Sequence, residues 1–153
     1  MEAPNEADER LPGPSLFLAG GISGCPDWQL RAVRRLDAAG CRAKIFNPRR
    51  TAFSVEDPAA APEQIAWEHR HLARADVILF WFPASDSMQP IALYELGAHA
   101  ARGKPLAVGT DPAYGRRLDV VEQLALERPE VLVHDSLRET VRTAMRLLDA
   151  VGA

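Results

Sequence analysis

The stretch Asp76-Val-Ile-Leu-Phe-Trp-Phe82 decides the fold. It is the most apolar run in the chain, and its apolar residues fall on both faces of a strand instead of alternating with polar ones. Strands buried on both faces are typical of a parallel sheet that helices cover from both sides. Pro83 follows directly and cannot continue the hydrogen bonding of a strand. The run therefore predicts a central strand that ends at Phe82.

Outward from this strand, strand-like and helix-like segments alternate. Short apolar runs bounded by Gly, Pro or Asn predict four more strands, at Ser15–Ala19, Cys41–Phe46, Lys104–Val108 and Val131–His134. Helical spacing with suitable start and stop residues predicts helices at Pro26–Ala39, Pro62 to about Ala73, Pro90 to about Arg102, Leu118–Glu127 and Ser136–Val151. Ser136 with Glu139 matches a capping box. Residues 48–61 have no clear period and are expected to form a long loop.

This alternation predicts an α/β fold in which one parallel five-stranded sheet is covered by helices on both faces. Right-handed crossovers leave few topologies, and we expect the flavodoxin-like strand order 2-1-3-4-5 in a single domain over residues 15–153. Such sheets bind ligands beyond the carboxyl ends of the strands, where the strand order reverses. The loops at that place are Gly20–Asp27 and Pro83–Gln89.

Charge is distributed unevenly along the 153 residues, whose net charge is −3. The segment Met1–Pro14 holds four acidic residues and one basic residue without an apolar period, and it is expected to be a disordered acidic tail. The remaining chain has 17 residues of each sign, which argues against a nucleic-acid polymer as partner. The pairs Arg34-Arg35, Arg49-Arg50 and Arg116-Arg117 could each reach a phosphate, but we interpret them as solvated charge.

Several classes of protein are disfavoured by simple features. Cys25 and Cys41 are too few for a disulfide scaffold or a zinc site. No signal peptide or membrane-spanning run is evident, so a cytoplasmic location is expected. His69 and His71 lie two residues apart on a predicted helix, which points their rings apart and disfavours a metal site. We interpret both histidines as surface or core-edge residues.

Two loops supply the candidate binding residues. Gly20 and Gly21 follow the first predicted strand and could let backbone N–H groups approach an anion, although a plain tight turn explains them equally well. Trp28, Phe82 and Met88 could stack on a nucleobase, but for each we expect ordinary packing, and Trp67 and Trp81 are expected in the core. The candidate substrate-contacting residues are Gly20, Gly21, Ser23, Asp27, Trp28, Phe82, Ser85, Asp86, Ser87, Met88 and Gln89.

Glu95 is the candidate nucleophile. It follows Pro90 closely at the start of a predicted helix, where the helix dipole favours an ionised carboxylate. Its apolar neighbours Leu93, Tyr94 and Leu96 suggest partial burial. A partly desolvated, ionised carboxylate can attack carbon. The alternative is a carboxylate that only offsets the helix dipole.

At this point the sequence resembles a known family. The motifs are F-L-A-G-G-I-S (17–23), F-N-P-R-R (46–50), W-E-H…A-D-V-I-L-F-W-F-P (67–83), Y-E-L-G (94–97), K-P-L-A-V-G (104–109) and R-R-L-D-V…Q-L-A-L (116–126). Taken together and in this order, they resemble the nucleoside 2-deoxyribosyltransferase family, in particular a bacterial branch of small members. The resemblance runs from about Ser15 to Leu137.

The resemblance implies a Rossmann-like sheet and a double displacement at the N-glycosidic bond. By position, Glu95 corresponds to the glutamate that attacks C1′ of the sugar, and Glu68 to the carboxylic acid that helps to protonate the leaving base. Two positions depart from the family pattern. Gln89 stands where the family has an aspartate six residues before the nucleophile, and Leu16 stands where it has a tyrosine.

The substrate and the assembly also follow from the resemblance. Related 5′-monophosphate N-glycosidases hold a phosphate with the first glycine-rich loop and nearby serines, which here are Gly20, Gly21, Ser23, Ser85 and Ser87. A free nucleoside and a monophosphate both remain open, and neither a metal nor a redox cofactor is required. A homodimer or a dimer of dimers is expected, with Asp119 either reaching a neighbour's site or serving as a surface acid at a helix start.

Two rival functions can be weighed on the same residues. A nucleotide or nucleotide-sugar sensor without turnover would share the fold and the pocket. A receiver-like signalling domain would need acidic residues at the ends of the first and third strands. Those places hold Ala19-Gly20-Gly21 and Phe82-Pro83, so the signalling interpretation is set aside.

Overall fold

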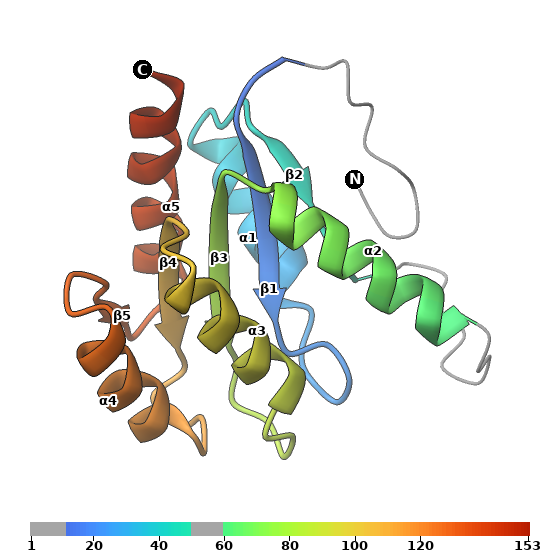
Figure 1. Ribbon diagram of the computed structural model, residues 1–153, viewed down its shortest axis with the longest axis vertical. Coiled ribbons are helices and arrows are strands. Elements are labelled where there is room, and N and C mark those ends of the chain that lie inside the picture. Colours follow the sequence, from blue (N-terminus) through green and yellow to red (C-terminus); the bar gives the residue numbers. More distant parts are fainter. Residues whose placement is uncertain (1–11, 50–59) are drawn as a thin grey trace.

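The computed structural model describes residues 12–49 and 60–153 (Figure 1). Its helices and strands run in the order β1 (Ser15–Gly20), α1 (Trp28–Ala38), β2 (Lys44–Phe46), α2 (Ala60–Arg74), β3 (Val77–Phe82), α3 (Pro90–Ala101), β4 (Leu106–Thr110), α4 (Arg117–Glu127), β5 (Val133–His134) and α5 (Leu137–Gly152). All strand pairs are parallel and the sheet order is β2-β1-β3-β4-β5. The predicted fold class and strand order are confirmed.

Both faces of the sheet are covered, as the sequence predicts. All six residues of β3 are buried. On one face, α2, α3 and α4 enclose a core that includes Phe17, Trp67 and Phe80. On the other face, α1 and α5 enclose a core that includes Leu18 and Trp81. The prediction that Trp67 and Trp81 lie in the core is confirmed.

The ends of the elements differ from the prediction for local reasons. Helix α1 begins at Trp28 instead of Pro26, because the side chain of Asp27 caps it by accepting a hydrogen bond from the backbone N–H of Leu30 at 3.0 Å. One of the two bonds of the predicted capping box of α5 is present, since Ser136 Oγ accepts from the backbone N–H of Glu139 at 3.2 Å. The edge strands β2 and β5 are shorter than predicted, with three and two residues. The acidic tail up to residue 11 and the loop residues 50–59 lie outside the described residues.

The interpretation of the histidines is wrong for His71. Its side chain is fully buried and stacks on Trp67, with ring centroids 4.1 Å apart. Its Nδ1 lies 2.8 Å from the backbone oxygen of Trp67. His69 is exposed on the same helix. A helical spacing of two residues separated the rings as expected, but it placed one of them in the core.

Two global features bear on the classes weighed from the sequence. In residues 12–49 and 60–153, no group of three His, Cys, Asp or Glu side chains is arranged to hold a metal ion. Among the helices that the structure describes, none is long and apolar enough to span a bilayer. Cys25 and Cys41 are free thiols, both half-buried.

Candidate active site

A pocket of about 280 Å³ opens at the carboxyl ends of β1 and β3. Three parts of the chain form its walls: the loop after β1 contributes Gly20–Ser23, helix α2 contributes Ile65 and Glu68, and the start of α3 contributes Ser87, residues 89–92 and Glu95. The sheet order reverses between β1 and β3, which is where ligands bind in open α/β sheets. The pocket therefore lies where the topology predicts, and it brings Glu95 and Glu68 together.

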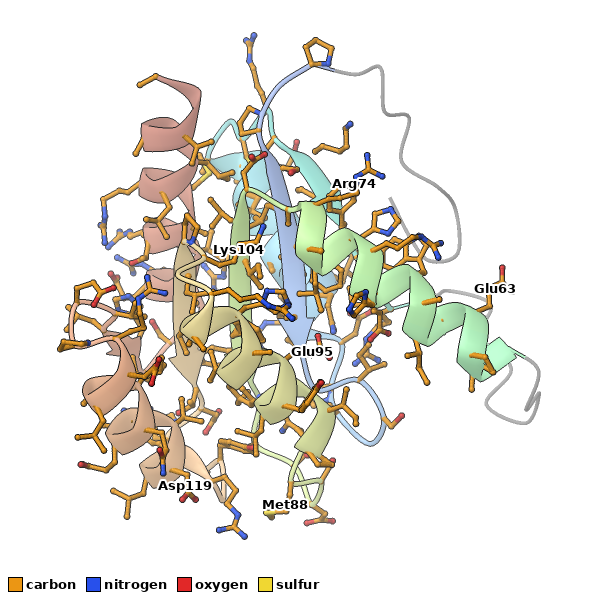
Figure 2. All side chains as sticks on the ribbon, in the orientation of Figure 1. Glu63, Arg74, Met88, Glu95, Lys104 and Asp119 are labelled. Atoms are coloured by element: carbon orange, nitrogen blue, oxygen red, sulfur yellow. The ribbon has the colours of Figure 1, made fainter. Side chains whose placement is uncertain are left out.

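Glu95 lies in the second turn of α3, and its side chain occupies the space between α3 and α2 (Figure 2). Burial, and secondarily the negative charge of Glu68, raise the pKa of the Glu95 carboxyl from 4.5 to about 8. The free protein therefore holds Glu95 largely protonated at pH 7. This differs from the ionised carboxylate expected from the sequence. The main reason is burial, which disfavours the charged form of the carboxyl, and Glu95 lies beyond the first turn of α3, where the helix dipole would favour that form.

Glu68 is oriented by a glutamine that the sequence did not single out. Gln64 lies one turn earlier on α2, and its Nε2 donates to Glu68 Oε1 at 2.7 Å and to the backbone oxygen of Pro48 at 2.9 Å. The sequence could have indicated this contact, because residues four apart on a helix lie on the same face and their side chains can meet. Gln64 thus connects Glu68 to the segment that follows β2.

The two glycines of the first loop are required by close packing. A Cβ on Gly20 would lie 2.0 Å from the backbone oxygen of Trp81, and the residue has a φ of +149°. A Cβ on Gly21 would lie 2.4 Å from Gln89 Oε1 and 2.5 Å from Cys25 Sγ. Without side chains here, the loop can lie directly against the end of β3 and the start of α3. The glycines both make the turn and form a wall of the pocket.

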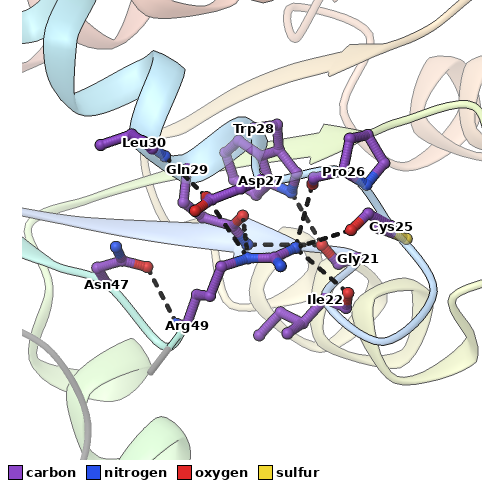
Figure 3. A network of polar contacts seen from close by, with 10 residues as sticks. All are labelled: Gly21, Ile22, Cys25, Pro26, Asp27, Trp28, Gln29, Leu30, Asn47 and Arg49. Carbon is purple, nitrogen blue, oxygen red and sulfur yellow. Dashed lines mark hydrogen bonds and ion pairs between the residues drawn. The ribbon is translucent and has the colours of Figure 1, made fainter. Parts of the chain in front are cut away.

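Arg49 holds the same loop from the other side (Figure 3). Its guanidinium Nη2 donates to the backbone oxygens of Ile22, Cys25 and Pro26 at 3.2, 3.2 and 3.1 Å. Its Nε donates to Gln29 Oε1 at 2.9 Å and lies 3.5 Å from Asp27 Oδ1. The interpretation of the Arg49-Arg50 pair as solvated charge is therefore wrong for Arg49, while Arg50 lies outside the described residues. Nothing in the local sequence marks which arginine of a pair folds inward.

The serines of the second loop mainly build its backbone. Ser85 Oγ accepts from the backbone N–H of Ser87 at 3.0 Å, and Ser87 Oγ accepts from that of Gln89 at 3.1 Å. Gln89 is buried with a φ of 55°, and its Nε2 donates to the backbone oxygen of Pro83 at 2.8 Å. Ser87 and Gln89 line the pocket, whereas Ser85 does not and Asp86 is exposed. Gln89 thus connects the end of β3 to the start of α3.

The stacking residues considered from the sequence do not offer a ring to the pocket. Trp28 is fully buried and its Nε1 donates to the backbone oxygen of Gly21 at 2.9 Å. Phe82 is also fully buried and stacks on Tyr114, with ring centroids 5.2 Å apart. Met88 is exposed but does not line the pocket. Two of the apolar side chains that do line it, Ile65 and Ile91, were missed because single exposed apolar residues carry no sequence signal.

Asp119 lies apart from this pocket. It is exposed on the first turn of α4, where its Oδ2 is 3.3 Å from Arg116 Nη1. It borders a second cavity of about 460 Å³ between α3 and α4, whose walls are mostly aliphatic. This cavity is larger than the first, but it lies away from both loops at the strand ends. Asp119 therefore cannot serve the pocket of its own chain in this conformation.

With this geometry established, comparison with known proteins gives the family. The family model described as nucleoside 2-deoxyribosyltransferase like matches residues 13–114. The chain belongs to this family. The match includes both loops of the pocket, Glu68 and Glu95, and it ends before Asp119. Membership implies chemistry at the N-glycosidic bond of a nucleoside or nucleotide. No curated protein matches the chain.

The raised pKa of Glu95 predicts how stability depends on pH. Below pH 4.5 the folded and unfolded chains both hold the proton, and its contribution to stability is fully present. As pH rises from 4.5 to about 8, the unfolded chain releases the proton while the folded chain keeps it, so the free energy of unfolding falls. Glu95→Gln removes this dependence. Denaturant titrations from pH 5 to 9 should show the variant gaining stability over wild type, by on the order of a few kcal/mol at the alkaline end. If the free energy of unfolding changed with pH in the same way for wild type and variant, the prediction would be contradicted.

Proposed function

We propose that the protein cleaves or transfers the N-glycosidic bond of a nucleoside or nucleoside 5′-monophosphate through a glycosyl-enzyme intermediate on Glu95. The observation that carries the proposal is the pairing of Glu95 and Glu68 in one pocket at the carboxyl edge of the sheet. Glycoside cleavage uses two carboxyl groups around an oxocarbenium-like transition state. The family match supports the same bond as the target.

The proposed reaction has two steps. A carboxylate oxygen of Glu95 bonds to C1′ as the C1′–N bond breaks, its electron pair leaves with the base, and Glu68 supplies a proton to that base. Water or a second base then attacks C1′ as the bond to Glu95 breaks, and the Glu68 carboxylate takes up the proton that the attacking group loses, which restores the pair. The active pair therefore holds one proton, with Glu95 ionised and Glu68 protonated. Because the proton lies mainly on Glu95 in the free protein, it must move to Glu68 when substrate binds.

The polar end of the sugar is proposed to lie against the first loop. Gly21, Ile22 and Ser23 line this side of the pocket, and Ser87 faces them from the second loop. Gln89 also lines the pocket, and its buried Oε1 has no hydrogen-bond donor in the described part of the chain. Buried acceptors are normally satisfied, so a hydroxyl-rich ligand such as a sugar suits its surroundings. A 5′-hydroxyl and a 5′-phosphate are both compatible with the loop.

A second copy of the chain is proposed to cover the mouth of the pocket. Ile65, Ile91 and Tyr94 expose about two thirds or more of their side chains on α2 and α3, and the two isoleucines line the pocket. Burying these side chains in a dimer would exclude water from the reacting groups.

Light scattering should give a dimer or larger assembly, and Ile91→Asp should shift it toward the monomer. A wild-type monomer at micromolar concentration would contradict this proposal.

The test of function is a substrate panel. Ribonucleosides, deoxyribonucleosides and their 5′-monophosphates are incubated with the protein, with and without an acceptor base, and released base is measured. Release that depends on the protein supports the enzyme, and exchange with the added base identifies transfer.

The protonated state of Glu95 at pH 7 favours one alternative, a nucleotide sensor. Tight binding without release of base from any member of the panel would support the sensor.

A further inference from the structure

We propose that Arg49 is a positioning residue for the pocket: its guanidinium sets the shape of the β1–α1 loop, and thereby which backbone groups that loop presents to the ligand. The inference rests on the proposed function for its effect on substrate, but the effect on the loop can be measured without turnover. Arg49 itself does not line the pocket and acts through residues 22–26.

The contacts of Arg49 require a guanidinium. One nitrogen, Nη2, lies within 3.2 Å of three backbone oxygens, while Nε points to the Gln29 amide. Figure 3 shows these bonds converging on one half-buried side chain. A lysine has a single Nζ and cannot reproduce the planar, forked arrangement of donors. A single Nζ could meet either the three backbone oxygens or Gln29 but not both, so the two sets of contacts together are fitted to arginine and not to positive charge alone.

These bonds turn the loop carbonyls away from the ligand. The oxygen of Ile22 accepts from Arg49 and from the backbone N–H of Cys25 at 3.1 Å, and the oxygen of Gly21 accepts from Trp28 Nε1. In a trans peptide the C=O and the N–H point in opposite directions. The N–H groups of Ile22 and Ser23 therefore point away from Arg49 and Trp28, and both residues line the pocket. Donors of this kind suit the oxygens of a sugar or a phosphate, whereas carbonyls would repel them.

The same short segment also supports the opposite wall of the pocket. The backbone N–H of Arg49 donates to Asn47 Oδ1 at 3.0 Å, which fixes the turn after β2. The oxygen of Pro48 accepts from Gln64, and Gln64 in turn donates to Glu68. Residues 47–49 therefore connect the first loop, through Arg49, with the acid on α2, through Pro48. Removal of the Arg49 side chain releases the loop but leaves the Pro48 connection in place.

The test compares Arg49→Ala and Arg49→Lys with Arg34→Ala, a control at an exposed arginine of α1. We expect KM for the best substrate of the panel to rise about ten- to a hundredfold in both Arg49 variants, with kcat changed less than about threefold. Such a split means that binding is lost while the reacting carboxyl groups keep their geometry. Adding ethylguanidinium to Arg49→Ala should lower KM again, and it should have no effect on Arg34→Ala.

A second measurement does not depend on activity. The indole N–H of Trp28 is bonded to the loop, whereas the rings of Trp67 and Trp81 lie in the core, so the three indole N–H exchange rates report loop and core separately. In Arg49→Ala only the Trp28 signal should exchange faster, by about tenfold or more. Unchanged exchange at Trp28, or equal acceleration at all three indoles, would overturn the inference. If wild type releases no base from any substrate, the proposed function fails and the indole exchange alone decides on Arg49.

Discussion

Glu95→Gln is expected to reduce base release at least about a thousandfold without unfolding the protein. Glutamine has nearly the same shape as glutamate but cannot form the bond to C1′, so the covalent route is closed. Because the Glu95 carboxyl is held largely protonated, the neutral amide suits its surroundings and the fold should tolerate it. Activity is measured as base release, and folding as the thermal transition. A variant that keeps more than a tenth of wild-type activity would remove Glu95 from the mechanism.

Glu68→Gln separates the two acids through the pH dependence. In wild type the proton that Glu95 holds at pH 7 is lost as pH rises through about 8, so kcat/KM should fall over that range. Glu68→Gln removes a negative charge that helps to raise the pKa of Glu95. We therefore expect a lower rate whose pH profile no longer falls near pH 8. Glu63→Gln, on the exposed side of the same helix, is the matched control and should leave the profile unchanged. A wild-type profile that shows no fall between pH 7 and 9 would contradict the shared proton.

Gly20→Ala is expected to lower the free energy of unfolding by about 3 kcal/mol or more. The added Cβ would lie 2.0 Å from the oxygen of Trp81 and 2.8 Å from a ring carbon of Trp28. The first of these atoms belongs to the backbone of β3, which pairs with β1 at this residue, so the strands would have to separate. The φ of +149° adds strain for any residue with a side chain. Denaturant titration measures the loss.

Gly97→Ala provides the control for this substitution. Gly97 lies inside α3, and a Cβ there would meet no atom within 4 Å. Alanine is the better helix former, so we expect a gain of about 0.5–1 kcal/mol. If the free energy of unfolding falls for Gly20→Ala and rises for Gly97→Ala, the space around each glycine decides the effect of adding a methyl group, and not the loss of glycine itself. Equal and small effects at both would contradict the close approach of β1 to β3.

Much of the fold follows from the sequence because burial leaves a simple pattern. The run at 76–82 has to be buried on both faces, and the alternation of strands with helices then limits the topology to the order that is found. The edge strands were predicted too long because apolar residues such as Cys41 and Val131 pack on the core without pairing in the sheet. His71 was misplaced because a histidine stacked on a tryptophan is not visible as an apolar position.

The candidate site could be predicted only in part, for a different reason. Glu95 was singled out by its place at a helix start, and Glu68 only by the resemblance to the family. Their meeting in one pocket depends on how two helices pack, which the sequence does not give. The groups that orient the site, Arg49 and Gln64, depend on contacts between residues far apart in the chain or on an ordinary helical spacing. The pKa of Glu95 depends on burial and on Glu68 together, so helix position alone gave the wrong protonation state.

The brevity of the two outer strands limits how copies of the chain can associate. With three residues in β2 and two in β5, each border of the sheet offers few free peptide groups for another chain to pair with. A continuous sheet across two molecules, and fibre-like stacking through these borders, are both disfavoured. The proposed dimer would instead use helical surfaces, and among these α2 and α3 carry the exposed apolar side chains around the pocket.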